Sequence, residues 1–115
     1  MSGRRKEMTE GGFRLISERF KALSEPMRLR LIYALMDGEK TVGQLVEETD
    51  SLQANVSKHL GILLDAGILG RRKDGLRAYY RITDETIYEL CDLVCGSLEQ
   101  RLSQELESLP RPGQS

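Results

Sequence analysis

Apolar residues recur at helical spacing along the first third of the chain. From Phe13 to Leu23 they stand three or four positions apart, which is typical of an amphipathic helix. The segment SEPMRLRLIYALMDG, residues 24–38, continues the pattern with Pro26 in a first turn and a glycine just past the last turn. The spacing therefore predicts two helices, the second of them capped by Ser24.

A capping box opens the third predicted helix. In TVGQ, Thr41 can accept a hydrogen bond from the backbone N–H of Gln44, and the Gln44 side chain can reach back. A fourth helix is expected to start near Ser51, which would cap it, and to end at Gly67. Its inward stripe is Val56, Leu60 and Leu63.

The pattern changes after this helix. The segments ILGRRK and RAYYRI are rich in β-branched and aromatic residues and flank an Asp-Gly turn signal, so they predict a β-hairpin. Helical spacing then returns from Thr83 to Leu109 and predicts one long helix. The order is α-α-α-α-β-β-α, a mainly α fold with a small β-hairpin.

One domain is expected in a chain of 115 residues. We place it at residues 13–109 and expect flexible tails at 1–12 and 110–115, which are rich in Gly, Pro, Ser and charge. The chain has no apolar run long enough to span a membrane and no apolar stretch behind its basic N-terminus. We therefore expect a cytoplasmic protein without membrane contact.

Charge is unevenly distributed along the chain, although the formal total is only −1. Residues 51–81 carry six basic and two acidic side chains, whereas residues 82–109 carry one basic and seven acidic side chains. The near-zero total therefore conceals a basic segment with the electrostatic character of a DNA-facing surface.

Two short helices followed by a hairpin match a winged helix-turn-helix. The stretch QANVSKHL opens the fourth helix with polar side chains, which in this geometry would pair with base edges in the major groove. The run RRK at 71–73 would meet phosphates. A short charge run alone is more often a solvated hairpin tip, but beside a polar-faced helix it favours DNA binding.

The segments LSEPMRLRLIYAL, QANVSKHLGILLDAGIL and RRKDGLRAYYRIT resemble the ArsR/SmtB family of winged-helix repressors. The resemblance covers about residues 13 to 106 and implies a homodimer that binds double-stranded operator DNA and leaves it when a metal, metalloid or oxidant binds. The implied DNA-binding residues are Gln53, Ala54, Asn55, Ser57, Lys58, His59, Arg71, Arg72, Lys73 and Arg77.

The resemblance also implies that the first and last helices hold the dimer together. Their apolar faces supply the expected interface, formed by Phe13, Ile16, Phe20, Ile87, Leu90, Val94, Leu98 and Leu102.

Two residues of the fourth helix region need separate interpretation. His59 lies beside the inward stripe, so a structural, half-buried histidine is an alternative to a base contact. Leu52 departs from the family pattern, in which many members have a polar residue at this position.

Most of the family's sensing sites are missing from this sequence. The third helix, TVGQLVEE, has no thiol where arsenical sensors carry a Cys-x-Cys-x-x-Asp pattern. The positions of the zinc ligands in zinc sensors fall on Asp84, Thr86, Ser97 and Gln100, of which only the aspartate could coordinate. Structural zinc sites need about four ligands, so neither site can work as in those relatives.

The remaining candidate is the pair in CDLVC. Cys91 and Cys95 are four positions apart on one helix, where their Cβ atoms are expected about 6 Å apart, too far for an undistorted disulfide. A trivalent arsenical or a soft metal ion has longer bonds to sulfur and could bridge them. The alternative is that both are small buried hydrophobic residues without a sensing role.

The sequence also bears on two other functional classes. A thiol-dependent enzyme is not indicated, because the chain has no Cys-x-x-Cys motif, no Gly-rich phosphate loop and only one histidine. A DNA-binding regulator without any small-molecule or metal site remains an alternative to the effector-controlled repressor.

Overall fold

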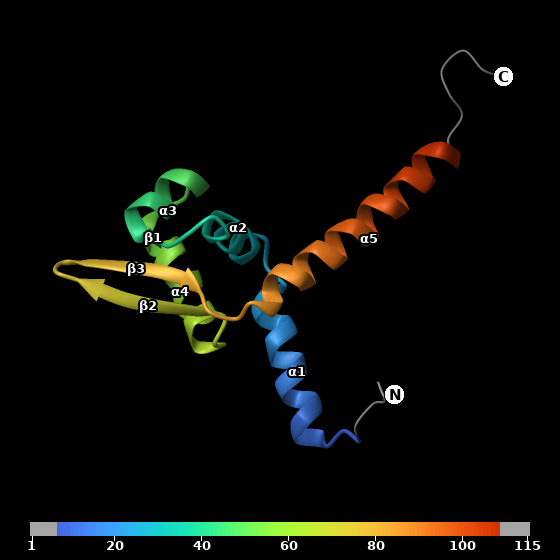
Figure 1. The fold of residues 1–115 in the computed structure, drawn as a ribbon, viewed down its shortest axis with the longest axis horizontal. Coiled ribbons are helices and arrows are strands. Elements are labelled where there is room, and N and C mark those ends of the chain that lie inside the picture. Colours follow the sequence, from blue (N-terminus) through green and yellow to red (C-terminus); the bar gives the residue numbers. More distant parts are fainter. Residues whose placement is uncertain (1–6, 109–115) are drawn as a thin grey trace, which may run out of the picture. The chain divides into compact units, whose positions relative to one another are not determined.

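The computed structural model describes residues 7–108, and Figure 1 shows their fold. The elements in chain order are α1 (Glu10–Leu23), α2 (Pro26–Leu35), β1 (Lys40–Thr41), α3 (Val42–Thr49), α4 (Gln53–Asp65), β2 (Leu69–Asp74), β3 (Arg77–Ile82) and α5 (Thr86–Ser108). The chain divides into two compact units, of which the first ends at Asp84 and the second begins at Glu85. The prediction of a single domain over residues 13–109 stays a prediction.

The first unit is the winged helix-turn-helix that the sequence predicted, with one strand more. The sheet has three antiparallel strands in the order β1-β3-β2, so the predicted order of elements is corrected to α-α-β-α-α-β-β-α. Lys40 pairs with Tyr80 and Thr41 with Tyr79 in the additional strand. Two residues are too few to show the alternation by which strands are recognised in a sequence.

The core of this unit consists of apolar residues on α2, α3 and α4 and immediately before β2. The fully buried ones are Leu31, Ile32, Leu35, Leu45, Val56, Leu60, Leu63 and Ile68. All three residues of the predicted inward stripe of α4 are among them, which confirms the orientation expected for this helix. Its opposite side faces away from the core.

Two predicted helix caps are wrong. Ser24 donates to the carbonyl of Lys21 at the end of α1, and Glu25 caps α2 through its carboxylate, 2.6 Å from the backbone nitrogen of Met27. Ser51 does not cap α4, because its hydroxyl lies near the carbonyl oxygen of Thr49. Leu52 occupies the cap position of α4 and makes no side-chain hydrogen bond there.

The first helix begins earlier than expected. Thr9 accepts a hydrogen bond from the backbone N–H of Gly12 at 2.9 Å and caps a helix that starts at Glu10. Residues 10–12, which were predicted to lie in the N-terminal tail, are therefore helical. Residues 1–6 and 109–115 lie outside the described part of the chain. An ion pair from Arg19 to Asp84 connects α1 to the segment after β3.

The turn of the β2–β3 hairpin lies one residue later than the Asp-Gly signal suggested. Asp74 pairs with Arg77, so Gly75 and Leu76 form the two-residue loop. Gly75 has a positive φ of 65°, as the first central residue of a tight hairpin turn requires. The side chain of Leu76 is fully exposed at the tip.

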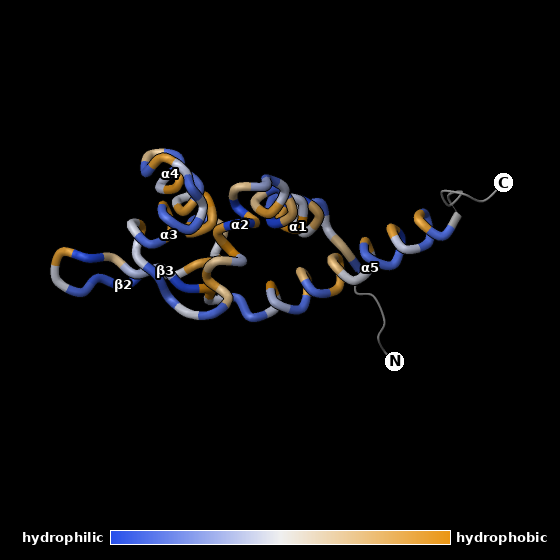
Figure 2. Tube along the Cα trace, turned by 90° about the horizontal axis from the view of Figure 1, so that it is seen from above, coloured by the Kyte–Doolittle hydropathy of each residue, from blue (hydrophilic) through white to orange (hydrophobic). Residues whose placement is uncertain are grey.

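The second unit consists mainly of α5, in which hydrophobic and hydrophilic residues alternate along the helix (Figure 2). No helix between residues 7 and 108 is both long and apolar enough to cross a lipid bilayer.

Candidate nucleic-acid interface

The outward side of α4 is polar and accessible. Gln53, Ala54, Asn55, Ser57 and Lys58 are all exposed, and they follow one another in the first two turns of the helix. Amide, hydroxyl and ammonium groups are the side-chain groups that recognise base edges and phosphates. The structure thus brings together five of the six residues predicted on this helix.

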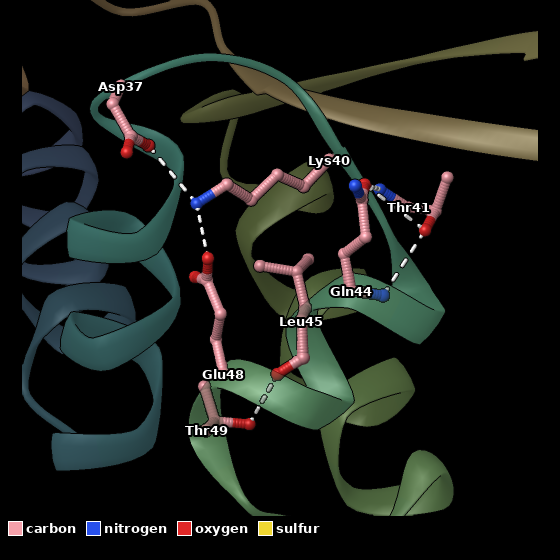
Figure 3. Close-up of polar contacts among 7 residues, drawn as sticks. All are labelled: Asp37, Lys40, Thr41, Gln44, Leu45, Glu48 and Thr49. Carbon is pink, nitrogen blue, oxygen red and sulfur yellow. Dashed lines mark hydrogen bonds and ion pairs between the residues drawn. The ribbon is translucent and has the colours of Figure 1, made fainter.

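The preceding helix, α3, is fixed at both ends before the chain turns into α4. The predicted capping box is confirmed, with the Thr41 N–H donating to Gln44 Oε1 at 2.8 Å and the Gln44 N–H donating to Thr41 Oγ1 at 3.2 Å (Figure 3). At the other end Asp50 adopts a left-handed conformation with φ of 51°, which stops the helix. Only residues 50–52 separate α3 from α4, so fixing one helix restricts the direction of the other.

Lys40 holds α3 to the segment that precedes it. Its ammonium group lies 2.7 Å from Glu48 on α3 and 3.1 Å from Asp37 after α2, as Figure 3 shows. The hydrogen bond to Glu48 is the largest effect on the pKa of Lys40 and raises it, and Asp37 adds to this against the opposing effect of partial burial. Lys40 is therefore a structural cation whose charge is already balanced by two carboxylates.

Arg28 links the end of α1 to α4. Its guanidinium donates from Nε to the carbonyl of Ala22 at 2.6 Å and from Nη2 to that of Lys21 at 3.2 Å. Its Nη1 lies 3.0 Å from Nδ1 of His59. Because arginine has no acceptor, Nδ1 of His59 is the acceptor of this hydrogen bond.

His59 is only 6% exposed, which corrects its inclusion among the DNA-contacting residues. The structural alternative describes its place in this fold, because the ring faces the core side of α4 and bonds to Arg28. No local pattern indicates this partner, since Arg28 is 31 positions away and stands in an apolar helical segment.

The cations of the hairpin differ in their surroundings. The side chains of Arg71, Lys73 and Arg77 are exposed and form no ion pair or hydrogen bond with other residues in the described range 7–108. Arg71 and Lys73 alternate with Arg72 along β2, so they lie on the opposite face of the hairpin from it. These three free cations are the side chains best placed to meet phosphates.

Arg72 has a structural role that the sequence did not indicate. Its Nε lies 3.0 Å from Oε2 of Glu39, its Nη2 bonds to the same carboxylate, and its guanidinium carbon lies 4.5 Å from the centre of the Tyr79 ring. This hydrogen bond is the largest cause of the lowered pKa of Glu39. Arg72 therefore links β2 to the segment before β1, and its assignment as a DNA-contacting residue stays a prediction.

The predicted dimer-interface residues are mostly exposed in the single chain. Phe13, Ile16 and Phe20 on α1 are 47–57% exposed, and Val94, Leu98 and Leu102 on α5 are 49–57% exposed. Leu90 is half-buried, and Ile87 is only 2% exposed. The assignment of these eight residues to a dimer interface stays a prediction.

The two cysteines lie on the same helix but differ in exposure. Cys91 is half-buried and Cys95 is exposed, so the alternative of two buried thiols does not describe Cys95 in this chain. Burial is the main cause of a raised pKa at Cys91, and the Asp92 carboxylate and Cys95 add to it. Within residues 7–108 no group of three or more His, Cys, Asp or Glu side chains is arranged to hold a metal ion, so the pair could supply two ligands.

The geometry defines a winged helix-turn-helix protein with an accessible polar helix and a basic wing. Residues 25–70 match the model of the bacterial regulatory protein, arsR family. The transcriptional regulator Rv0081 of Mycobacterium tuberculosis is 33% identical over 84% of this chain and 86% of its own length. The probable mercury resistance operon repressor of Streptomyces lividans is 37% identical over 62% of this chain and 57% of its own length.

Solved structures agree with this relationship. The crystal structure of Rv0081 has a TM-score of 0.77, at 31% identity, over 85% of this chain and 99% of the other. The homodimeric winged helix-turn-helix DNA-binding domain Mb0332 of Mycobacterium bovis has a TM-score of 0.76, at 25% identity, over 90% of this chain and 95% of the other. The antimony-specific transcriptional repressor AntR has a TM-score of 0.75, at 28% identity, over 87% of this chain and 91% of the other.

The chain belongs to the ArsR family of bacterial transcriptional regulators.

The link made by Arg28 can be tested by its effect on stability. Arg28→Met removes the donors to Ala22 and His59 while keeping an unbranched apolar side chain. We expect the free energy of unfolding to fall by about 1.5–3 kcal/mol, the range for hydrogen bonds to a charged group. Urea denaturation measures this change. Arg14→Met, at an exposed position of α1, is the matched control, and an equal loss in both variants would contradict the linking role.

Proposed function

We propose that this protein is a homodimeric transcriptional repressor that reads operator DNA with α4 and holds the DNA backbone with its wing. The observation that carries the proposal is that the polar side of α4 is accessible and that the hairpin carries three exposed cations without ion pairs, Arg71, Lys73 and Arg77. In a winged helix-turn-helix such a helix enters the major groove. Membership of the ArsR family supports the same function and a location in the cytoplasm, where DNA is accessible.

The two surfaces have different tasks in this mechanism. Gln53 and Asn55 carry amide groups, which can donate to and accept from base edges and so distinguish sequences. Arg71 and Lys73 carry charges that attract any phosphate backbone and contribute affinity without sequence preference. Affinity and specificity should therefore respond to different substitutions.

Substitutions in the wing and in α4 test this division. Arg71→Ala or Lys73→Ala should weaken binding to all duplexes and lower the slope of log affinity against log salt by about one for each lost phosphate contact. Gln53→Ala should instead reduce the preference for the operator over random DNA. Fluorescence anisotropy titrations at several salt concentrations measure both effects.

A matched control for the wing variants is Arg101→Ala, which removes the same charge from the acidic α5. Its salt slope should equal that of the wild type. An unchanged slope in both wing variants would contradict the proposed role of the wing.

The homodimer is supported by the apolar residues that α1 and α5 leave exposed. Six of the eight expected interface residues are about half exposed in the single chain, although their side chains are large and apolar. Apolar faces of this kind are typically covered in an assembly, and a two-fold dimer buries the same face of both subunits. The neighbouring Mb0332 domain is a homodimer.

Leu98→Glu tests the dimer. Leu98 is 55% exposed on α5, so a glutamate is tolerated in the free chain but would be desolvated at an interface. We expect this variant to be monomeric in sedimentation equilibrium at micromolar concentration and to lose operator binding. Glu99→Gln, at the adjacent position, should remain dimeric. A monomeric wild-type protein would contradict the proposal.

We further propose that Cys91 and Cys95 bind the effector, a trivalent arsenical or a soft metal ion, and thereby release the repressor from DNA. Support comes from the spacing of the thiols, from the exposure of Cys95, and from relatives described as mercury resistance and antimony-specific repressors. The raised pKa of Cys91 opposes binding at neutral pH, because the thiol must lose its proton first. This last observation favours the alternative of a regulator without a small-molecule or metal site.

Serine substitutions distinguish the two alternatives. Cys91→Ser and Cys95→Ser should each abolish release of operator DNA by arsenite or cadmium, while binding without effector stays within about twofold of the wild type, a change of less than 0.5 kcal/mol. In the wild type the cadmium concentration for half-release should fall as pH rises from 6 to 8, because each bound thiol must release a proton. Release of the double serine variant by the same ligand would show that the effector acts elsewhere.

A further inference from the structure

Leu52, at the start of α4, is an unusual residue both for a helix N-cap and for an exposed position. It occupies the N-cap position, where Ser, Thr, Asp or Asn is preferred, and provides no side-chain hydrogen bond to the first turn. It is also 80% exposed, so its apolar side chain gains little from burial. The adjacent Ser51 has a suitable hydroxyl, but that hydroxyl lies near Thr49 and Met27 instead.

Within the described part of the chain no side-chain hydrogen bond caps α4 in place of Leu52. The backbone of Leu52 is extended, with φ of −68° and ψ of 145°, a conformation that serine or asparagine also adopts. Proteins tend to break local sequence rules at functional sites. The position of Leu52 therefore points to a contact made outside the chain.

The location of Leu52 limits what that contact can be. The first residues of a recognition helix approach base edges in the major groove, and Leu52 immediately precedes Gln53, the first residue of α4. In that groove the C5-methyl group of thymine is the only apolar group that a base pair presents. A leucine side chain can cover this methyl group but cannot form a hydrogen bond to any other group in the groove.

We infer that Leu52 reads a thymine methyl group and so fixes a thymine in each half of the operator. The inference rests on the proposed function, because it requires α4 to lie in the major groove. It adds a specificity-determining residue to the polar set on α4. It also explains why an apolar residue stands at this position although a polar one would cap the helix.

Deoxyuridine provides a direct test, because it pairs as thymine does and lacks only the methyl group. A duplex is first selected from a random library with the full wild-type chain, and each thymine is then replaced singly by deoxyuridine. At one thymine in each half-site we expect affinity to fall about fourfold, the factor that corresponds to about 0.8 kcal/mol for one buried methyl group.

Two leucine variants identify the residue responsible. Leu52→Ser should bind thymine and deoxyuridine duplexes equally, and its melting temperature should be no lower than that of the wild type, because serine is a better N-cap. Leu76→Ser, at the fully exposed tip of the wing, is the matched control and should keep the fourfold difference.

The outcomes separate this inference from the proposed function. Selection of a duplex without any deoxyuridine-sensitive thymine would overturn the role of Leu52 and leave the repressor function intact. The same conclusion follows if the sensitivity persists in Leu52→Ser, or if that variant is less stable than the wild type. Failure of the wild-type chain to enrich any sequence would instead overturn the proposed function.

Discussion

The guanidinium group of Arg28 connects the parts of the first unit on which recognition of DNA depends. It bonds to two carbonyl groups at the end of α1 and to the buried ring of His59 on α4. Carbonyl groups at the end of a helix lack partners within the helix, and a cation stabilises them. The Arg28 side chain thus supplies partners for carbonyl groups at the end of α1 and holds the His59 side of α4 toward the core. The polar side of α4 then faces away from the core.

The same link between helices constrains how a change elsewhere could reach the polar side of α4, which we propose binds DNA. A change in the position of the end of α1 would alter the geometry of three hydrogen bonds that share one rigid, planar group. The turn between α3 and α4 is only three residues long, and α3 is held by its capping box and by Lys40. The first unit is therefore tightly connected from α1 to α4.

Much of the fold could be predicted from the sequence because its main signals are local. Helical spacing gave the five helices and the inward residues of α4, and the Thr41–Gln44 capping box gave the start of α3. The strand β1 was missed because two residues show no period. The predicted caps at Ser24 and Ser51 are wrong. The carboxylate of Glu25 caps α2, and Leu52 stands at the N-cap position of α4 without a side-chain hydrogen bond. In both cases the cap position falls on the next residue along the chain, Glu25 or Leu52.

The candidate site was predicted less completely, because its corrections concern partners distant in sequence. His59 and Arg28 are 31 positions apart, and Arg72 and Glu39 are 33 apart, so no local pattern joins them. A basic run such as RRK shows where cations occur but not which of them are already paired. The apolar stripe of α5 likewise did not show that Ile87 is buried whereas Val94 and Leu98 are about half exposed.

The pairing of Arg72 with Glu39 and Tyr79 has a further consequence for the wing. Binding to DNA restricts side chains that were free before, at a cost of about 0.5–1.5 kcal/mol for each long side chain immobilised. Arg72 is already held by a carboxylate and an aromatic ring, so its conformational entropy was lost when the protein folded. The central cation of the RRK run thus makes the wing stiff, and only its neighbours lose freedom when the complex forms.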